Sequence, residues 1–270
     1  DIDADNKDDV IGRTNTGQWW AGVSNGNSFT NQLFGTWSAA VTWNNVMVAD
    51  VNGDGKDDVI GRTNSGQWWA GISNGNTINN ILLGAWSNAV TWGNIMTADV
   101  NGDGKEDIIG RTNSGDWWAG ISNGNTISNQ KLGTWSTEVT WSNIMIADIN
   151  ADNKDDVIGR TNSGQWWAGL SDGNTITNQL LGTWSTAVTW NNIMVADINA
   201  DNKDDIIGRV QSTGQWWAGI SNGNTINNIY LGTWSTAVTW LDIMIADINA
   251  DNKDDIIGRT DYGQWWAGIS

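Results

Sequence analysis

The chain has 270 residues, with 22 Trp, no Cys, His or Pro, and a formal net charge of −17. Without Cys or His, thiol nucleophiles, histidine acid–base chemistry and most transition-metal sites are excluded, and no disulfide stabilises the fold. Only 13 Lys and Arg are present, so no basic patch for nucleic acid can form, and no apolar run is long enough for membrane insertion.

An internal repeat organises the sequence. An acidic segment recurs six times, beginning at Asp1, Asp50, Asp99, Asp148, Asp197 and Asp247. The starts are 49 residues apart, except the last step of 50, because residues 210–213 contain one extra residue. The chain is interpreted as one repeat domain, residues 1–270, with units 1–49, 50–98, 99–147, 148–196, 197–246 and a partial unit 247–270.

The elements of one repeat are taken in order from residue 191. Residues 191–197 are a short apolar run that predicts a first strand leading into the acidic loop. Residues 204–209 leave the loop as a second strand. In the second copy, residues 67–73 predict a third strand and residues 77–87 a fourth.

Tight turns join these predicted strands. Asn64-Ser65-Gly66 places Gly where a hairpin needs it, and Asn74-Gly75-Asn76 contains the strongest short hairpin signal. Four short antiparallel strands per repeat, without helical periodicity, predict an all-β fold, a β-propeller of four-stranded blades. Small alanines such as Ala98 fit an innermost strand. An open β-solenoid is the alternative.

The two ends of the chain are incomplete in this pattern. The first unit lacks its first strand, because the chain begins inside the loop at Asp1, and the last unit lacks its fourth strand. We favour six blades, two of them incomplete, and five or seven blades are the alternatives. A start at Asp1 without Met indicates a processed or excised form, and leaves a homo-oligomer or a place in a longer chain as possibilities.

The acidic loop carries oxygen-bearing side chains at positions 1, 3, 5 and 9. Calcium takes six to eight oxygen ligands, and the main-chain carbonyl of position 7 would add another. Position 6 is Gly55 or Gly104 in two copies and Asn in the others, and these residue types accept positive φ most readily. Position 12 is Gly, so the loop is not an EF-hand. Acidic Asx-turns without an ion are the alternative.

The charge distribution supports a cation in each loop. Five acidic residues lie in the first loop and four in each of the other five, which accounts for 25 of the 30. Six Ca²⁺ ions would add twelve positive charges and change the net charge from −17 to −5. That value is ordinary for a soluble protein.

The segment Asp50-Val-Asn52-Gly-Asp54-Gly55-Lys-Asp-Asp58 resembles the FG-GAP/VCBS repeats of integrin α-type propellers and secreted bacterial proteins. The resemblance covers nearly the whole chain and implies up to six structural Ca²⁺ ions. The implied side-chain ligands are Asp1, Asp3, Asp5, Asp9; Asp50, Asn52, Asp54, Asp58; Asp99, Asn101, Asp103, Asp107; Asp148, Asn150, Asp152, Asp156; Asp197, Asn199, Asp201, Asp205; and Asp247, Asn249, Asp251, Asp255. The implied carbonyl ligands belong to Lys7, Lys56, Lys105, Lys154, Lys203 and Lys253.

Tryptophan is unusually frequent in this chain, with 22 in 270 residues. Each full unit has four, including an adjacent pair on the third strand, whose side chains face opposite sides. Trp68 shares its face with Ala70 and Ile72, which indicates core, whereas Trp69 shares a more polar face with Gln67. Tryptophan that only fills the space between blades is the structural alternative.

We therefore expect a multivalent, lectin-like module that binds carbohydrate in Trp-lined grooves between blades, and the similarity to bacterial and fungal propeller lectins adds to this reading. The candidate ligand-binding residues are Trp20, Trp69, Trp118, Trp167, Trp217, Trp266, Arg62, Arg111 and Arg160. The alternative is a structural or adhesive module with surface-protein partners. No enzyme is expected, because the chemistry repeats evenly. Dependence on calcium implies an extracellular or cell-surface location.

Overall fold

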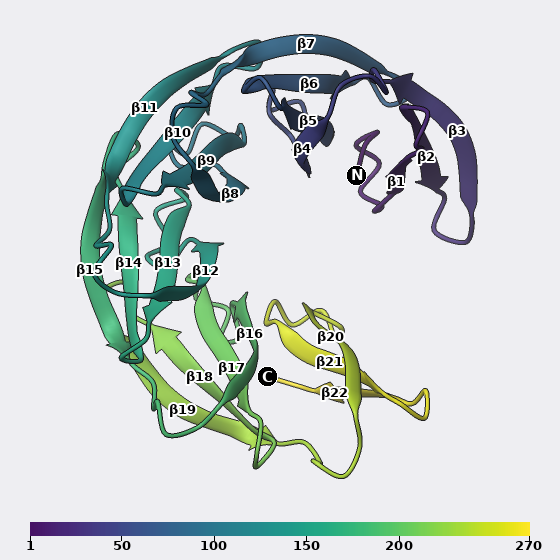
Figure 1. Ribbon diagram of the computed structural model, residues 1–270. Helices are drawn as coiled ribbons and strands as arrows, with labels where there is room; N and C mark the ends of the chain where they lie inside the picture. Colours follow the sequence, from purple (N-terminus) through teal and green to yellow (C-terminus); the bar gives the residue numbers. More distant parts are fainter. The chain divides into compact units, whose positions relative to one another are not determined.

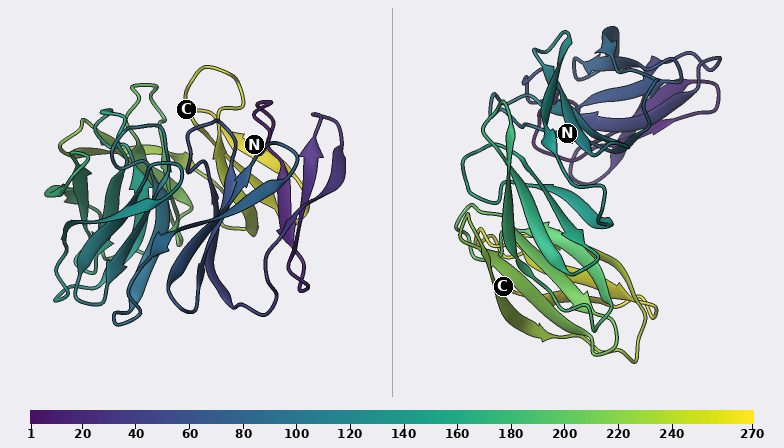
Figure 2. Two further views of the ribbon diagram at one scale, coloured as in Figure 1. Left: turned by 90° about the horizontal axis from the view of Figure 1, so that it is seen from above. Right: turned by 60° about the vertical axis from the view of Figure 1, so that its left-hand side comes forward.

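The computed structural model describes residues 1–270 and contains 22 β-strands in six antiparallel sheets (Figure 1). The two views of Figure 2 show strands and loops without helices. No segment is therefore a helix that is long and apolar enough to cross a membrane. The chain divides into two compact units, Asp1–Trp135 and Ser136–Ser270. One repeat domain over the whole chain stays a prediction.

The first unit contains three sheets. The first is β1 (Val10–Arg13), β2 (Gln18–Ser24) and β3 (Phe29–Thr36); the second is β4 (Trp43–Ala49), β5 (Asp58–Thr63), β6 (Gln67–Ser73) and β7 (Ile78–Ala85); the third is β8 (Trp92–Ala98), β9 (Asp107–Thr112), β10 (Asp116–Ser122) and β11 (Ile127–Thr134). Each sheet is a simple meander in which consecutive strands pair. Short hairpins with positive-φ glycines, such as Gly66 and Gly75, make this connection possible.

The second unit repeats the same arrangement. Its sheets are β12 (Trp141–Ala147), β13 (Asp156–Thr161), β14 (Gln165–Ser171) and β15 (Ile176–Thr183); β16 (Trp190–Ala196), β17 (Asp205–Val210), β18 (Gln215–Ser221) and β19 (Ile226–Thr233); and β20 (Trp240–Ala246), β21 (Asp255–Thr260) and β22 (Trp265–Gly268). The acidic loops connect the first strand of a sheet to the second.

The six sheets are the six blades of a β-propeller fold, as the sequence predicts. The first has three strands because its innermost strand is missing, and the last has three because its outermost strand is missing. The predicted third strand, residues 67–73, coincides with β6. The predicted fourth strand is shorter than expected, because residues 86–91 form the connector to the next blade rather than strand.

The hydrophobic core lies between neighbouring blades of each unit. One cluster joins Trp68 and Ala70 of β6 to Ile108 of β9, and another joins Trp19 of β2 to Val59 of β5. In the second unit, Trp166 of β14 packs in one cluster with Ile206 of β17. Because apolar side chains on facing sheets fill the space between them, each blade is stabilised by its neighbour rather than by its own interior.

One glycine in four of the second strands, β5, β9, β17 and β21, is required by the close approach of an indole ring. A Cβ atom built on Gly61 would lie 2.8 Å from the ring of Trp37, and one on Gly110 would lie 2.7 Å from the ring of Trp86. These tryptophans belong to the connector of the preceding blade. The same position in the first sheet, Gly12, has nothing within 4 Å.

Candidate functional sites

Three equivalent grooves lie between neighbouring blades, two in the first unit and one in the second. Their volumes are about 240, 280 and 290 Å³. Each is lined by the connector of one blade and by residues from all four strands of the next. The matching residues are Trp37, Trp43, Gln67, Trp69 and Asn80; Trp86, Trp92, Asp116, Trp118 and Asn129; and Trp184, Trp190, Gln215, Trp217 and Asn228. We name the grooves after their third-strand tryptophans, Trp69, Trp118 and Trp217.

Alternation along the third strand separates the two tryptophans of each pair. Trp68 is completely buried in the core, whereas Trp69 is half-buried and lines its groove. Trp117 and Trp118 show the same difference. The structure therefore gives each pair one core residue and one groove residue, as the strand alternation predicts.

The neighbours of Trp69 on its strand do not all contribute to the groove. Gly71 packs against Ile78, and Ser73 is buried with its hydroxyl bonded to the main chain of the preceding loop. Only Gln67 lies beside Trp69 in the groove. No hydrogen bond within the protein engages the side chain of Gln67, so its carboxamide is available to a ligand.

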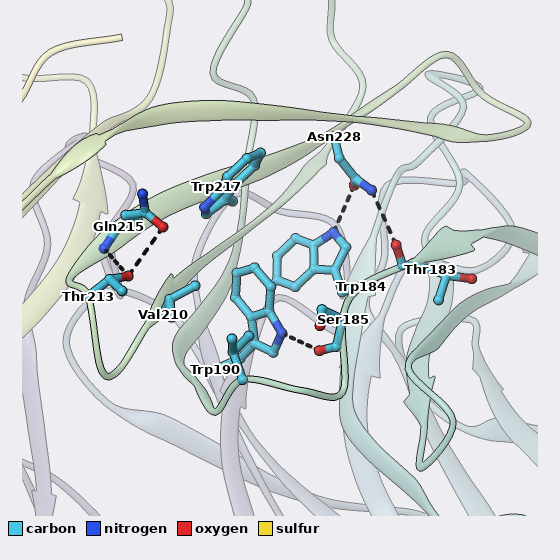
Figure 3. A pocket seen from close by; sticks show the side chains of 10 residues that line it. Thr183, Trp184, Ser185, Trp190, Val210, Thr213, Gln215, Trp217 and Asn228 are labelled. Carbon is cyan, nitrogen blue, oxygen red and sulfur yellow. Dashed lines mark hydrogen bonds between the residues drawn. The ribbon is translucent and has the colours of Figure 1, made fainter.

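The walls of the grooves are fixed by hydrogen bonds (Figure 3). In the Trp217 groove, the indole N–H of Trp184 donates to Asn228 at 2.9 Å, and the Asn228 amide donates to the carbonyl of Thr183 at 3.2 Å. The ring of Trp190 stacks on Trp184 at 4.4 Å and donates its N–H to the Ser185 carbonyl. These polar groups are occupied, so Trp184 and Trp190 present apolar ring surface.

The arginines predicted as ligand-binding residues lie outside the grooves. Arg62 donates to the Trp86 and Ser87 carbonyls at 3.4 Å and to Asn88 Oδ1 at 2.7 Å. Arg160 holds the connector of its own blade in the same way. Burial lowers the pKa of Arg62, Arg111 and Arg160 below the usual arginine value. None of the three lines a groove, and Arg62 and Arg160 support the connectors that form groove walls.

Trp20 and Trp266 lie in three-stranded sheets. Trp20 is 41% exposed in the first sheet, and Trp266 is 56% exposed in the last sheet, which ends after its third strand. Trp167 is half-buried on β14, like its counterparts. Grooves with all of these elements lie around Trp69, Trp118 and Trp217.

The acidic loops are organised around the carboxylate at position 1. In the second copy, Asp50 accepts the main-chain N–H groups of Gly53 and Gly55 at 2.7 Å. Position 6 has positive φ in every copy, from 60° at Asn153 to 80° at Gly55, as the sequence predicts. Position 4 also has positive φ, even where it is alanine, as at Ala151 (59°). The glycines at position 4 in two copies, Gly53 and Gly102, could have indicated this positive φ from the sequence.

The carboxylate at position 9 is the buried member of the candidate ligand set. Asp58 is fully buried and accepts main-chain N–H groups from Ser73 at 2.7 Å and Val51 at 3.3 Å. Burial raises its pKa to about 7, and the nearby carboxylates of Asp50 and Asp54 add to the shift, against these hydrogen bonds. Three further position-9 residues have their pKa raised to about 7 for the same leading reason: Asp107, Asp156 and Asp205.

These residues fit a hard cation. Oδ2 of Asp107 is buried and has no hydrogen-bond partner, and the carboxylate oxygens of Asp1, Asp3 and Asp9 lie within 4.8 Å of one another. A buried acceptor without a donor is costly, and crowded carboxylates repel unless a cation is present. The half-exposed ammonium group of Lys56, 3.6 Å from Asp54, supplies only weak compensation.

Within each unit, the acidic loops are also bonded to the following blade, which the sequence did not reveal. The N–H of Asp57 donates to the Asp1 carbonyl at 2.8 Å, and Ser73 Oγ donates to the Ile2 carbonyl at 2.6 Å. Ser122 makes the corresponding bond to the Val51 carbonyl at 2.6 Å. The two serine bonds join residues 71 positions apart in the chain, so only the packing of neighbouring blades brings these partners together.

Comparison with known proteins agrees with this geometry. The model of the FG-GAP-like repeat matches residues 50–110 and 99–159, which contain the second, third and fourth acidic loops. Residues 50–159 therefore carry FG-GAP-like repeats. No curated protein sequence matches the chain significantly.

Solved structures share the fold of these FG-GAP-like repeats. A structure of BBS1N in complex with ARL6DN is similar with a TM-score of 0.53 and 12% identity, covering 94% of this chain and 74% of that one. YCF48 from Cyanidioschyzon merolae is similar with a TM-score of 0.51 and 11% identity, covering 96% and 81%. At these identities the likeness shows the propeller fold alone.

Proposed function

We propose that this FG-GAP-like repeat protein is a carbohydrate-binding module whose sites are the Trp-lined grooves. The observation that carries the proposal is the recurrence of one partly exposed indole, Trp69, Trp118 or Trp217, at the same place in three grooves. Sugar rings present an apolar C–H face that packs on indole, and their hydroxyl groups bond to side chains such as Gln67.

The size of the grooves suits a small ligand. Their volumes of about 240 to 290 Å³ lie at or just below the lower end of the range for small-molecule pockets, roughly 300–1,000 Å³. One such groove holds little more than a sugar ring, so each site alone is weak. Several sites on one chain raise the overall avidity for a multivalent glycan by a factor of about 10²–10⁴.

Calcium in the acidic loops is the second part of the proposal. The side chains at positions 1, 3, 5 and 9 would hold the ion with the carbonyl of position 7, and the ion would neutralise the buried carboxylate at position 9. Extracellular modules bind Ca²⁺ with Kd values of about 10⁻⁴–10⁻³ M, which cytosolic calcium does not fill. The proposed location is therefore outside the cell or at its surface.

A protein ligand is the second candidate function. Leu82 on β7 is 45% exposed and Leu180 on β15 is 38% exposed, so the fourth strands present apolar side chains to solvent. The propeller in the BBS1N structure was solved in a complex with a protein. Enzymatic activity is not proposed, because the groove chemistry repeats from blade to blade without one distinct acid–base set.

A glycan array in millimolar calcium, repeated in EDTA, tests the proposed function. We expect a defined set of glycans to bind in calcium. Trp69→Ala, Trp118→Ala and Trp217→Ala together are expected to abolish this binding while the protein stays folded, since these rings are only half-buried. Absence of binding by folded wild-type protein would refute the carbohydrate proposal and favour the protein ligand.

Trp68→Ala is the matched comparison. Its ring is fully buried, so the substitution is expected to cost about 3–5 kcal/mol of stability. Circular dichroism and a thermal melt separate the two effects. If Trp69→Ala and Trp68→Ala destabilised the fold equally, the assignment of Trp69 to a ligand site would be wrong.

A further inference from the structure

The grooves are not chemically identical, and the Trp217 groove departs from the repeat at several points. Val210 lies where the other two grooves have Thr63 and Thr112. The one extra residue of the chain lies in the turn after Val210, and Thr213 of this turn lines the groove. Tyr230 occupies the position of Leu82 in the second blade. These departures are far apart in the sequence of one blade but gather around one groove.

The change from Thr to Val alters the apolar surface. Thr63 Oγ1 is bonded to Ser65 Oγ at 2.8 Å and accepts the Gln67 N–H at 3.1 Å. Val210 replaces this hydroxyl by a methyl group in the same nearly buried position, whereas Val188 has an equivalent, Val41, in the Trp69 groove. The floor of the Trp217 groove is therefore more apolar than that of the Trp69 groove.

The turn before the third strand also orients one hydrogen-bonding group, as in the fourth blade, where Ser163 Oγ donates to Gln165 Oε1 at 3.4 Å. Thr213 Oγ1 donates to Gln215 Oε1 at 3.2 Å, and Figure 3 shows Gln215 beside Trp217 with Val210 nearby. Because Oε1 is occupied as an acceptor, the Nε2 group remains as a donor for a ligand. Gln67 in the second blade has no such partner, so its carboxamide can flip by rotation and present either its oxygen or its nitrogen to a ligand.

The aromatic wall of this groove is reinforced as well. Tyr230 meets Trp217 edge to face with 5.6 Å between ring centroids, and its hydroxyl shares a 2.7 Å hydrogen bond with Thr233. No ionised side chain lines the groove, whereas the Trp118 groove contains Asp116, paired with Lys131 at 2.8 Å. The Trp217 groove thus favours a neutral ligand.

We propose that the Trp217 groove prefers a neutral sugar ring that carries an acetamido group. The ring stacks on Trp217, the acetamido carbonyl accepts a hydrogen bond from Gln215 Nε2, and the acetamido methyl packs on Val210. The groove volume of about 290 Å³, against 240 Å³ for the Trp69 groove, leaves room for this substituent. The inference rests on the proposed carbohydrate-binding function and specifies the ligand class of one site.

The test compares N-acetylglucosamine with glucose by NMR titration of protein with ¹⁵N-labelled indole groups. Trp217→Phe, Trp69→Phe and Trp118→Phe identify the three groove signals. At the Trp217 signal we expect N-acetylglucosamine to bind about tenfold more tightly than glucose, the discrimination expected when a substituent fills an apolar pocket. Val210→Thr, which restores the residue of the other blades, is expected to remove most of this preference. Thr63→Val is the matched control and is expected to leave the ratio at Trp217 unchanged.

The possible outcomes are distinct. Equal affinity for the two sugars at Trp217, or a ratio that Val210→Thr does not change, overturns the inference and leaves the carbohydrate proposal standing. A ratio at Trp217 that changes with Thr63→Val also overturns it, because the preference would not be local to this groove. If neither sugar moves any of the three groove signals, the proposed function fails together with the inference.

Discussion

Single residues at equivalent places in the repeat have different surroundings, and the first blade provides an internal comparison. Gly110 lies under the ring of Trp86, and Gly12 occupies the same strand position without a neighbour. The sequence around both residues is nearly the same, so it does not distinguish them. Only the presence of a preceding blade does so.

Gly110→Ala is therefore expected to destabilise the protein, and Gly12→Ala is not. The added methyl group would lie 2.7 Å from a ring that is itself packed, and overpacking of this kind costs about 1–3 kcal/mol. Urea denaturation followed by tryptophan fluorescence measures both variants. Similar midpoints for the two would contradict the packing of the connector tryptophan on the second strand.

At the scale of elements, the acidic loop has a second role beside its candidate metal site. Its main-chain carbonyls at positions 1 and 2 accept hydrogen bonds from the following blade, as Val51 does from Ser122. A loop that holds an ion would therefore also hold the next blade in place. The ion and the joint between blades are expected to be coupled energetically for this reason.

Ser122→Ala tests the joint. The substitution leaves the Val51 carbonyl without its 2.6 Å donor in a buried setting, which is expected to cost about 1–3 kcal/mol. Ser24→Ala is the control, because Ser24 Oγ bonds only within its own turn, accepting the Gly26 N–H. Hydrogen exchange should show faster opening of residues 50–58 in Ser122→Ala alone. Unchanged exchange there would argue against the joint.

At the scale of the whole molecule, the proposed calcium ions bear on stability as a group. A site that is saturated tenfold above its Kd contributes about 1.4 kcal/mol, so six such sites contribute roughly 8 kcal/mol. Typical domains have a total stability of about 5–15 kcal/mol. Calcium would then provide a large part of the stability of the folded chain.

Chelation with EDTA is accordingly expected to lower Tm by more than about 10 °C. Readdition of calcium should restore Tm, and magnesium should restore less of it, since the smaller ion requires a stricter octahedral arrangement. Differential scanning calorimetry of one sample through these steps is sufficient. A melt that EDTA leaves unchanged would rule out structural calcium.

The sequence by itself determined the repeat, the strands and the blades, because these depend on local patterns. Alternation assigned Trp68 to the core and Trp69 to the opposite face, and Asn or Gly at position 6 indicated the positive φ that the structure shows. Turn residues such as Asn74-Gly75 placed the hairpins. Each of these properties follows from a few consecutive residues, so the chain order alone is sufficient.

Only the tertiary structure decided which of these residues meet. The bond from Ser73 to the Ile2 carbonyl spans 71 residues, and the grooves combine a connector with strands of the following blade. The arginines that the sequence offered as ligands instead support connectors, because the nearest acceptors are main-chain carbonyls about 24 residues further along. Contacts across blades depend on how the sheets pack, and no local pattern in the sequence records that.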